Sequence, residues 1–472
     1  MRTYENLYIN GQWTKPNGSG TDQVINPATE EVVAKVPYGD ETDVDNAVQA
    51  ARAAFDAWST TPSAERADYL RKIADEMKKR SAEFEVTMVE ELGIPVSLAD
   101  DYQVCGPIDA CEGYANRCSQ MDEVEEINNS MVIKEAVGVC AFINPWNYPL
   151  SQMIGKVAPA LAAGCTMVVK AASQTPSHAF ILAEAIDAAG LPAGVFNLVH
   201  GAGRTIGEKM CSHPEVDMVS FTGSTGAGIK IAEAAAPTVK RVCQELGGKS
   251  AYIITEDANL ADAVAYGVED VMVNTGQTCT ALTRMLVAES HYEEAVQIAK
   301  DYAEAMKVGD PADADSYIGP MSSQSQRNTV LSYIDKGIAE GARLVTGGTQ
   351  MPDGISKGAY VLPTIFADVN NKMVIAQEEI FGPVLAMIPY STIDQAVEIA
   401  NDTVFGLSSA VYAKDKQAAI AIARRLRAGQ CYVNGGDYNY DAPFGGYKQS
   451  GNGREWGDEG LNEFVEIKSI QM

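Results

Sequence analysis

The stretch TMVVKAASQTPSHAFILAEAIDAAGLPAGVFNLV, residues 166–199, decides the fold. A short β-branched run at 166–169 is followed by an apolar helical stretch at 178–189 and a second run at 195–199. Gly190-Leu191-Pro192 closes the predicted helix. Strand, helix and strand in this order predict a parallel sheet, because parallel neighbours need a crossover connection.

Strands and helices alternate along most of the chain after residue 138. The remaining predicted strands lie at 216–221, 251–254, 284–288, 383–390 and 431–433. The series before and after Gly248 predict two lobes with a cleft between them. Parallel sheets bind ligands at the carboxyl ends of their strands, so we expect a nucleotide at the loops after Val169, Val199 and Phe221.

Three other segments lie outside the two strand–helix series. Residues 62–92 carry apolar positions at helical spacing, which predicts one long amphipathic helix with Thr61 as its N-cap and Pro62 in its first turn. Residues 120–136 and 461–472 fit neither lobe. Both contain alternating stretches that we expect to pair as edge strands between subunits.

Composition excludes several classes of protein. The chain has 472 residues and a net charge of -27, which disfavours nucleic acid and anionic membranes as partners. Its longest apolar stretch, 157–169, is too short to span a bilayer, and the N-terminus has no signal-peptide pattern. Nine cysteines without a Cys-x-x-Cys pair favour a reducing cytoplasm. Four histidines without ligand spacing give no support for a metal site.

Two loops bear on ligand binding. FTGSTGAG, residues 221–228, follows a predicted strand and opens a predicted helix, where glycines let backbone N–H groups approach a phosphate. Its Gly-x-x-Gly-x-Gly spacing is not the dinucleotide fingerprint, so a tight turn without a ligand is the alternative. PWNYP, residues 145–149, is either a packing loop or a rigid loop that presents the Asn147 amide to a developing oxyanion.

Cys279 and Glu245 are the candidate nucleophile and base. Cys279 lies in the small polar segment NTGQTCTALTR, 274–284, just before a strand. A free cysteine is usually an inert buried residue, and an unperturbed thiol is only about 3% thiolate at pH 7, so a nucleophile needs help from its surroundings. Glu245 precedes paired glycines in ELGGKS, 245–250, which can present its carboxylate to a cleft; a solvated helix-end glutamate is the alternative.

Together these motifs resemble, in order, those of the NAD(P)-dependent aldehyde dehydrogenase superfamily. The matching segments are 145–149, 221–226, 245–249, GQTC at 276–279, EEIFGP at 378–383 and PFGGYK at 443–448, with YINGQW at 8–13 and EIK at 466–468 near the ends. The resemblance covers essentially the whole chain. It implies an α/β fold with a Rossmann-like parallel-sheet cofactor domain (1–119 and 137–247), an α/β catalytic domain (248–447) and a small β oligomerisation arm (120–136 and 448–472). It also implies a homodimer or homotetramer.

The resemblance implies a role for each matching residue. Cys279 would attack the aldehyde, the Asn147 amide and the Cys279 N–H would hold the oxyanion, and Glu245 would activate the water that hydrolyses the thioester. The implied cofactor residues are Trp146, Lys170, Ser173, Gly223, Ser224, Glu379 and Phe381.

Two departures from the family pattern concern specificity. Ser173 stands where the family often has a glutamate that opposes a 2′-phosphate, so we expect NADP to be accepted beside NAD. Two outcomes are open: NADP is preferred, or Ser173 merely permits NADP while NAD remains dominant. Little bulk at Gln152 and Gly155 predicts a wide substrate tunnel. The segment DYNYD, 437–441, would add aromatic and anionic groups to it; a solvent-facing loop is the alternative. Together these features favour aromatic or neutral medium-chain aldehydes, whereas a carboxylate-bearing aldehyde would need an arginine that reaches in. The predicted substrate residues are Tyr148, Gln152, Gly155, Thr278, Thr280, Tyr438 and Tyr440.

Three other functions remain open at this stage. A CoA-acylating aldehyde dehydrogenase also forms a cysteine thioester, but such enzymes typically lack the general-base glutamate that Glu245 provides. A cofactor-independent cysteine hydrolase or acyltransferase would use Cys279 with purely structural glycine loops. A non-catalytic binding protein would have no need of Cys279, Glu245 and Asn147 together.

Overall fold

The segment at 166–199 forms β9 (Thr166–Lys170), α7 (Ser177–Ala188) and β10 (Phe196–Val199) in the computed structural model, which describes residues 1–472. β9 and β10 pair in parallel, with Phe196 opposite Met167. They belong to an eight-stranded sheet of order β20-β12-β11-β8-β9-β10-β2-β3, in which the five strands from β12 to β10 are parallel. Its other strands are β20 (Gly451–Asn452), β12 (Arg241–Glu245), β11 (Met218–Thr222), β8 (Val139–Ile143), β2 (Leu7–Ile9) and β3 (Gln12–Thr14). The predicted parallel sheet is confirmed.

Helices cover both faces of this sheet, because alternate strand residues point to opposite sides. Val139 and Ala141 belong to one apolar cluster, whereas Cys140 and Phe142 belong to another. The first face packs against α1 (Glu41–Ser59), α8 (Glu208–Ser212) and α9 (Thr225–Ala235). The second face packs against α2 (Ser63–Lys79), α5 (Cys105–Arg117), α6 (Pro149–Ala163) and α7, and every residue of α6 is buried.

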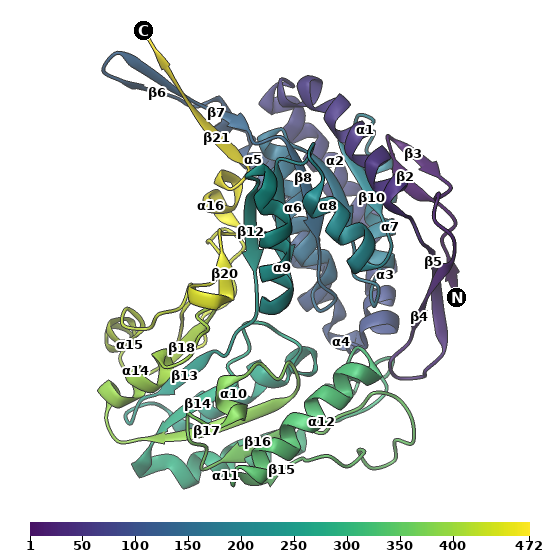
Figure 1. The fold of residues 1–472 in the computed structure, drawn as a ribbon. Coiled ribbons are helices and arrows are strands. Elements are labelled where there is room, and N and C mark those ends of the chain that lie inside the picture. Colours follow the sequence, from purple (N-terminus) through teal and green to yellow (C-terminus); the bar gives the residue numbers. More distant parts are fainter.

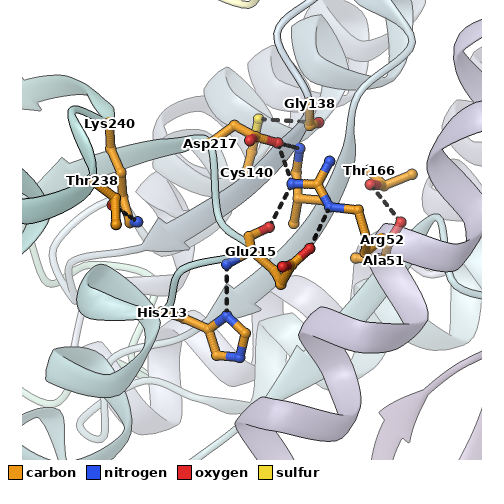
Figure 2. A network of polar contacts seen from close by, with 11 residues as sticks. Ala51, Arg52, Gly138, Cys140, Thr166, His213, Glu215, Asp217, Thr238 and Lys240 are labelled. Carbon is orange, nitrogen blue, oxygen red and sulfur yellow. Dashed lines mark hydrogen bonds and ion pairs between the residues drawn. The ribbon is translucent and has the colours of Figure 1, made fainter.

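An ion-pair network fixes α1 to the sheet (Figure 2). Arg52 donates to an Asp217 carboxylate oxygen at 2.6 Å and to the Glu215 carbonyl at 2.7 Å. The same Asp217 oxygen accepts the Val139 N–H at 2.7 Å, at the start of β8. The network therefore ties α1 to the amino ends of β8 and β11. The candidate ligand loops lie at the opposite, carboxyl ends of the strands.

A seven-stranded sheet forms the second lobe, in the lower half of Figure 1. Its order is β15-β16-β17-β14-β13-β18-β19, and only β15 is antiparallel to its neighbour. The strands are β13 (Ala251–Ile254), β14 (Arg284–Ala288), β15 (Arg343–Thr346), β16 (Thr364–Ala367), β17 (Val384–Tyr390), β18 (Ser409–Tyr412) and β19 (Tyr432–Val433). The helices are α10 (Leu260–Met272), α11 (Tyr292–Ala305), α12 (Gln324–Ala339), α13 (Val374–Gln377), α14 (Ile393–Asn401) and α15 (Lys416–Ala423).

A narrow three-stranded arm projects from the first lobe beside the C-terminus (Figure 1). It consists of β6 (Val124–Ile127), β7 (Ser130–Ala136) and β21 (Val465–Gln471), paired antiparallel in the order β21-β7-β6. The two segments that were expected to pair between subunits therefore pair with each other within one chain. The short helix α16 (Gly457–Asn462) leads into β21.

A second correction concerns residues 62–92. The backbone leaves helical geometry at Arg80 (φ -107°, ψ 9°), so the single predicted helix is divided into α2, α3 (Ser81–Thr87) and a π-helical segment, Met88–Leu92. Pro62 rather than Thr61 occupies the N-cap position, without a side-chain cap. The short α4 (Val96–Ala99) follows.

The N-terminal residues add a small sheet of order β1-β5-β4 at the side of the first lobe. Its strands are β1 (Arg2–Thr3), β4 (Thr21–Ile25) and β5 (Val32–Pro37). None of the helices combines the length and the apolar character that crossing a membrane requires.

Candidate active site

Cys279 lies on a tightly turned loop between α10 and β14. Asn274 and Thr275 have positive φ (51° and 56°), and Gly276 follows at φ +70°. A Cβ on Gly276 would lie 2.2 Å from the Gly382 carbonyl carbon, so only glycine lets this loop pack against the EEIFGP segment. The turn therefore brings two of the sequence motifs into contact and places Cys279 at the surface of the cleft.

Cys279 is partly exposed, and it lines two cavities. We call the first the aromatic cavity; it has a volume of about 410 Å³. Its walls are Asp101, Tyr102, Cys105, Gly106, Tyr148, Ser151, Gln152, Tyr266, Asp270, Val273, Thr278, Cys279, Thr280, Tyr432, Gly436, Tyr438, Tyr440 and Phe444. We call the second, of about 270 Å³, the cleft cavity. Its walls are Pro145, Trp146, Asn147, Gln152, Thr222, Gly223, Ser224, Leu246, Gly247, Cys279, Gln326, Thr329, Tyr333, Glu379, Ile380 and Phe381.

The Asn147 amide is held against the cysteine loop. Its Nδ2 donates to the Gln277 carbonyl at 3.0 Å. The main-chain carbonyl of Asn147 accepts from Gln103 Nε2 at 3.1 Å and from Asn274 Nδ2 at 3.0 Å. The residue is 5% exposed and lines the cleft cavity with Cys279. One amide hydrogen on Nδ2 remains without a protein acceptor, so it can donate to an oxygen bound beside Cys279.

Glu245 ends β12 and is buried, and neither of its carboxylate oxygens has a hydrogen-bond partner. Burial, and then the neighbouring Glu455 carboxylate, raise the pKa of Glu245 well above its usual range, while Lys156 and Arg454 oppose the rise. Its side chain lies in a small pocket with Lys156 and Glu455 rather than in the walls of the two larger cavities. The charge of Glu245 nevertheless raises the pKa of the Cys279 thiol.

Five of the predicted cofactor residues line the cleft cavity: Trp146, Gly223, Ser224, Glu379 and Phe381. The rings of Trp146 and Phe381 meet edge to face at 5.3 Å. Ser224 caps α9 by accepting the Ala227 N–H. Glu379 accepts the Gly248 N–H at 2.9 Å, and burial raises the pKa of Glu379 to about 7.

Lys170 and Ser173 lie outside both cavities, at and just beyond the carboxyl end of β9. Lys170 is buried, and its Nζ donates to the Ala171 carbonyl at 2.9 Å. Burial lowers the pKa of Lys170 to about 8, and Asp22 opposes this shift.

Six of the seven predicted substrate residues line the aromatic cavity: Tyr148, Gln152, Thr278, Thr280, Tyr438 and Tyr440. The Tyr148 hydroxyl is hydrogen-bonded to Thr278 Oγ1 at 2.8 Å. Gly155 is the exception, because it lies outside the cavity wall and beneath the Trp456 ring; a Cβ there would lie 3.0 Å from that ring. The space that a missing side chain at position 155 leaves is therefore occupied by Trp456 and does not widen the cavity.

The model of the aldehyde dehydrogenase family matches residues 13–470. The chain belongs to this family. It is 47% identical over 471 residues to a 3-succinoylsemialdehyde-pyridine dehydrogenase from a Pseudomonas species, covering 100% of this chain and 99% of the relative. Aldehyde dehydrogenase C from Pseudomonas syringae, solved as a mutant with NAD+ and octanal, is 45% identical, with a TM-score of 0.98 over 99% of this chain and 96% of that one. A Mycobacterium tuberculosis aldehyde dehydrogenase solved with NAD+ is 43% identical, with a TM-score of 0.97 over 100% and 98%. The similarity confirms the predicted fold class.

The buried ion pair beside Glu245 in this aldehyde dehydrogenase was not predicted from the sequence. Lys156 Nζ lies 2.6 Å from Glu455 Oε1 and also donates to Thr222 Oγ1 at 2.7 Å and to the Gln152 carbonyl at 3.0 Å. A lysine next to the longest apolar stretch was the available signal, since a buried lysine needs a partner.

Asp270 was also not predicted from the sequence; it lines the aromatic cavity together with six tyrosines. One of its oxygens accepts the Leu282 N–H at 2.8 Å, and burial raises the pKa of Asp270 to about 7. The tyrosines whose phenol pKa values its charge raises are Tyr102, Tyr148, Tyr252, Tyr266 and Tyr432.

Proposed function

We propose that this aldehyde dehydrogenase oxidises its aldehyde to the carboxylic acid through a covalent intermediate on Cys279, with the acceptor dinucleotide in the cleft cavity and the aldehyde in the aromatic cavity. The observation that carries the proposal is that Cys279 lies in the walls of both cavities. The sulfur can therefore bond to the carbonyl carbon of an aldehyde in the aromatic cavity, and the hydride can leave that carbon toward the cleft cavity.

The first half of the reaction forms and oxidises a thiohemiacetal. Burial, and then the charges of Glu379 and Glu245, raise the pKa of the Cys279 thiol, so the sulfur must lose its proton to a base as it attacks. The oxygen of the adduct would accept hydrogen bonds from the Asn147 amide and the Cys279 N–H. Loss of a hydride from the former aldehyde carbon then gives a thioester.

The second half hydrolyses that thioester. Glu245 would accept a proton from a water molecule, whose oxygen bonds to the acyl carbon as the sulfur leaves. Its raised pKa makes the carboxylate a strong proton acceptor. Because Glu245 lies outside the cavity walls, we infer that its side chain rotates toward Cys279 for this step.

The cleft cavity fits a dinucleotide. The first N–H groups of α9 have no acceptor within the helix, and a Cβ on Gly226 would meet nothing within 4 Å, so a pyrophosphate can approach. Glu379 can accept a ribose hydroxyl. When bound, NAD+ supplies the hydride acceptor. The relatives from P. syringae and M. tuberculosis are solved with NAD+, which supports NAD+ as the cofactor here. Acceptance of NADP+ stays a prediction from Ser173.

The walls of the aromatic cavity support aromatic or neutral medium-chain aldehydes. Tyrosine and phenylalanine rings dominate them, and no lysine or arginine is present to pair with a substrate carboxylate. The Asp101 carboxylate would instead repel one. The pyridine-bearing substrate in one relative's name and the octanal bound to another agree with this preference.

Two further proposals concern assembly and location. The exposed strand β6 and the exposed side chains of β21 leave the arm ready to pair or pack with a second copy, which supports the predicted homodimer or homotetramer. All nine cysteines are free, which agrees with the predicted cytoplasmic location.

A panel of aldehydes with NAD+ or NADP+ and without CoA tests the function. We expect NADH and the carboxylic acid in equal amounts, fastest with benzaldehyde-like and medium-chain aldehydes. A strict need for CoA would favour the acylating alternative, acyl transfer without NADH would favour the hydrolase, and turnover of succinic semialdehyde alone would contradict the proposed substrate class.

A further inference from the structure

A carboxylate approaches the Lys170–Ser173 segment from a distant part of the chain. Asp22 belongs to β4, in the small N-terminal sheet, where it pairs with Val36 of β5. Its Oδ2 lies 3.4 Å from Nε2 of His200, the residue directly after β10. Lys170 ends the neighbouring strand β9, so Asp22 reaches the edge of the parallel sheet where strand carboxyl ends meet.

The two residues directly after β5 fix the position of His200 beside Asp22. The Gly39 N–H donates to the His200 carbonyl at 2.8 Å, and the Tyr38 ring stacks on the His200 ring with centroids 6.0 Å apart and planes 8° apart. The His200 side chain is fully buried, whereas the Asp22 side chain is 19% exposed. The carboxylate therefore has a fixed position with one side open to solvent.

Asp22 keeps its negative charge in this setting. Burial alone would raise the pKa of Asp22, but His200, Ser173 and Tyr38 act against it and bring that pKa below its usual value. Burial lowers the pKa of His200, so the ring is neutral at pH 7 and does not cancel the charge. The charge of Asp22 also raises the pKa of Lys170, which ends β9.

We propose that Asp22 supplies the carboxylate that position 173 lacks, and that it makes the adenosine-ribose end of the site prefer NAD+ over NADP+. The inference rests on the proposed function. The Ser173 hydroxyl lowers the pKa of Asp22 as a hydrogen-bond donor, and such a hydroxyl can accept a ribose hydroxyl while it donates to the carboxylate. A 2′-phosphate carries a charge of about -2 and would meet Asp22 across the open side, so repulsion offsets its attraction to Lys170.

Equilibrium binding without aldehyde tests the proposal, because it needs no catalysis. The probes are NAD+ and NADP+, titrated by calorimetry against the wild type, Asp22→Asn and Asp22→Glu. We expect the wild type to bind NAD+ at least tenfold more tightly than NADP+. Asp22→Asn should bind NADP+ at least fivefold more tightly than the wild type does, with NAD+ changed less than threefold. Asp22→Glu should retain the preference.

Two controls separate charge from packing. Glu31→Gln removes one exposed carboxylate from the β4–β5 connection and should leave the ratio of the two dissociation constants unchanged. High salt should bring the ratio of the NADP+ and NAD+ dissociation constants of the wild type closer to one. The same ratio for Asp22→Asn should change less, since salt screens charge repulsion and does not alter shape.

The proposal is wrong if the wild type binds NADP+ as tightly as NAD+, if Asp22→Asn leaves the ratio within twofold of wild type, or if Asp22→Glu behaves like Asp22→Asn. An Asp22 variant that loses affinity for NAD+ and NADP+ to the same extent would also contradict it, because that result would mean that Asp22 acts through packing and not through its charge. Failure of the proposed function would look different: no aldehyde would give NADH with the wild type, whatever the binding ratio.

Discussion

Replacing Asn147 by alanine tests the proposed oxyanion site in isolation. The amide is one of two donors available to the thiohemiacetal oxygen, the other being the Cys279 N–H. Loss of one such donor costs about 2.7–4 kcal/mol of transition-state stabilisation, so we expect kcat to fall about 10²–10³-fold. The structure predicts little accompanying damage, because the Gln277 carbonyl that Asn147 binds also accepts from Asn274 Nδ2 at 3.4 Å.

The assay combines three measurements on this variant. NADH formation with benzaldehyde gives kcat, and calorimetry should show NAD+ affinity within threefold of wild type. Acylation by p-nitrophenyl acetate without cofactor passes through an oxyanion at the same carbon, so its rate should fall by a similar factor. Asn197→Ala is the control, because it removes buried hydrogen bonds to Met167 and Gly194 and Asn197 lines neither cavity. It should lower stability while the kcat of folded protein stays within threefold.

The reasoning would be refuted by an Asn147→Ala enzyme that retains more than a fifth of the wild-type kcat. It would also be refuted if NAD+ affinity collapsed in parallel with kcat, since the amide would then be a cofactor contact.

The other predictions concern the base, its ion pair and the thiol. The wild-type kcat for a rate-limiting hydrolysis should rise with pH up to a value well above the usual pKa of a glutamate, because the ionised form of Glu245 is the base and its pKa is raised. Glu455→Gln should move that rise to lower pH and Lys156→Met to higher pH, since the first removes a negative and the second a positive neighbour; shifts of the same sign would contradict the assignment. Lys156→Met should also reduce the free energy of unfolding by about 3–5 kcal/mol, measured by denaturant titration. The double variant with Glu455→Gln should show a smaller reduction in the free energy of unfolding, because no unpaired charge is left buried. Iodoacetamide should alkylate Cys279 slowly at pH 7 and faster as pH rises, because the thiol pKa is raised; fast, pH-independent alkylation would show a thiolate in the free enzyme.

The parts of the fold that sequence predicted are those that local pattern determines. Strands 251–254 and 284–288 were placed to the residue, because β-branched runs bounded by turn residues leave little freedom. The division at Arg80 has no such local signal, since the apolar positions continue on both sides of it at helical spacing.

The features of the site that sequence missed depend on long-range contacts. Lys156 and Glu455 are 299 positions apart, and Asp22 and His200 are 178 apart, so no motif records either pair. Gly155 shows the same limit: the space beside it depends on where Trp456 lies. Motif resemblance places Cys279, Asn147 and Glu245 in the chain, but the orientation of Glu245 away from the cavities needs the structure.

The central claim is that Cys279 carries the acyl group during turnover. Intact-protein mass spectrometry of Glu245→Gln mixed with NAD+ and benzaldehyde tests it directly, because this variant should form the thioester and hydrolyse it slowly. The account predicts one benzoyl group per chain, located on Cys279 by peptide mapping, together with one equivalent of NADH. One equivalent of NADH or more with an unmodified Cys279, or a benzoyl group on another residue, would contradict it.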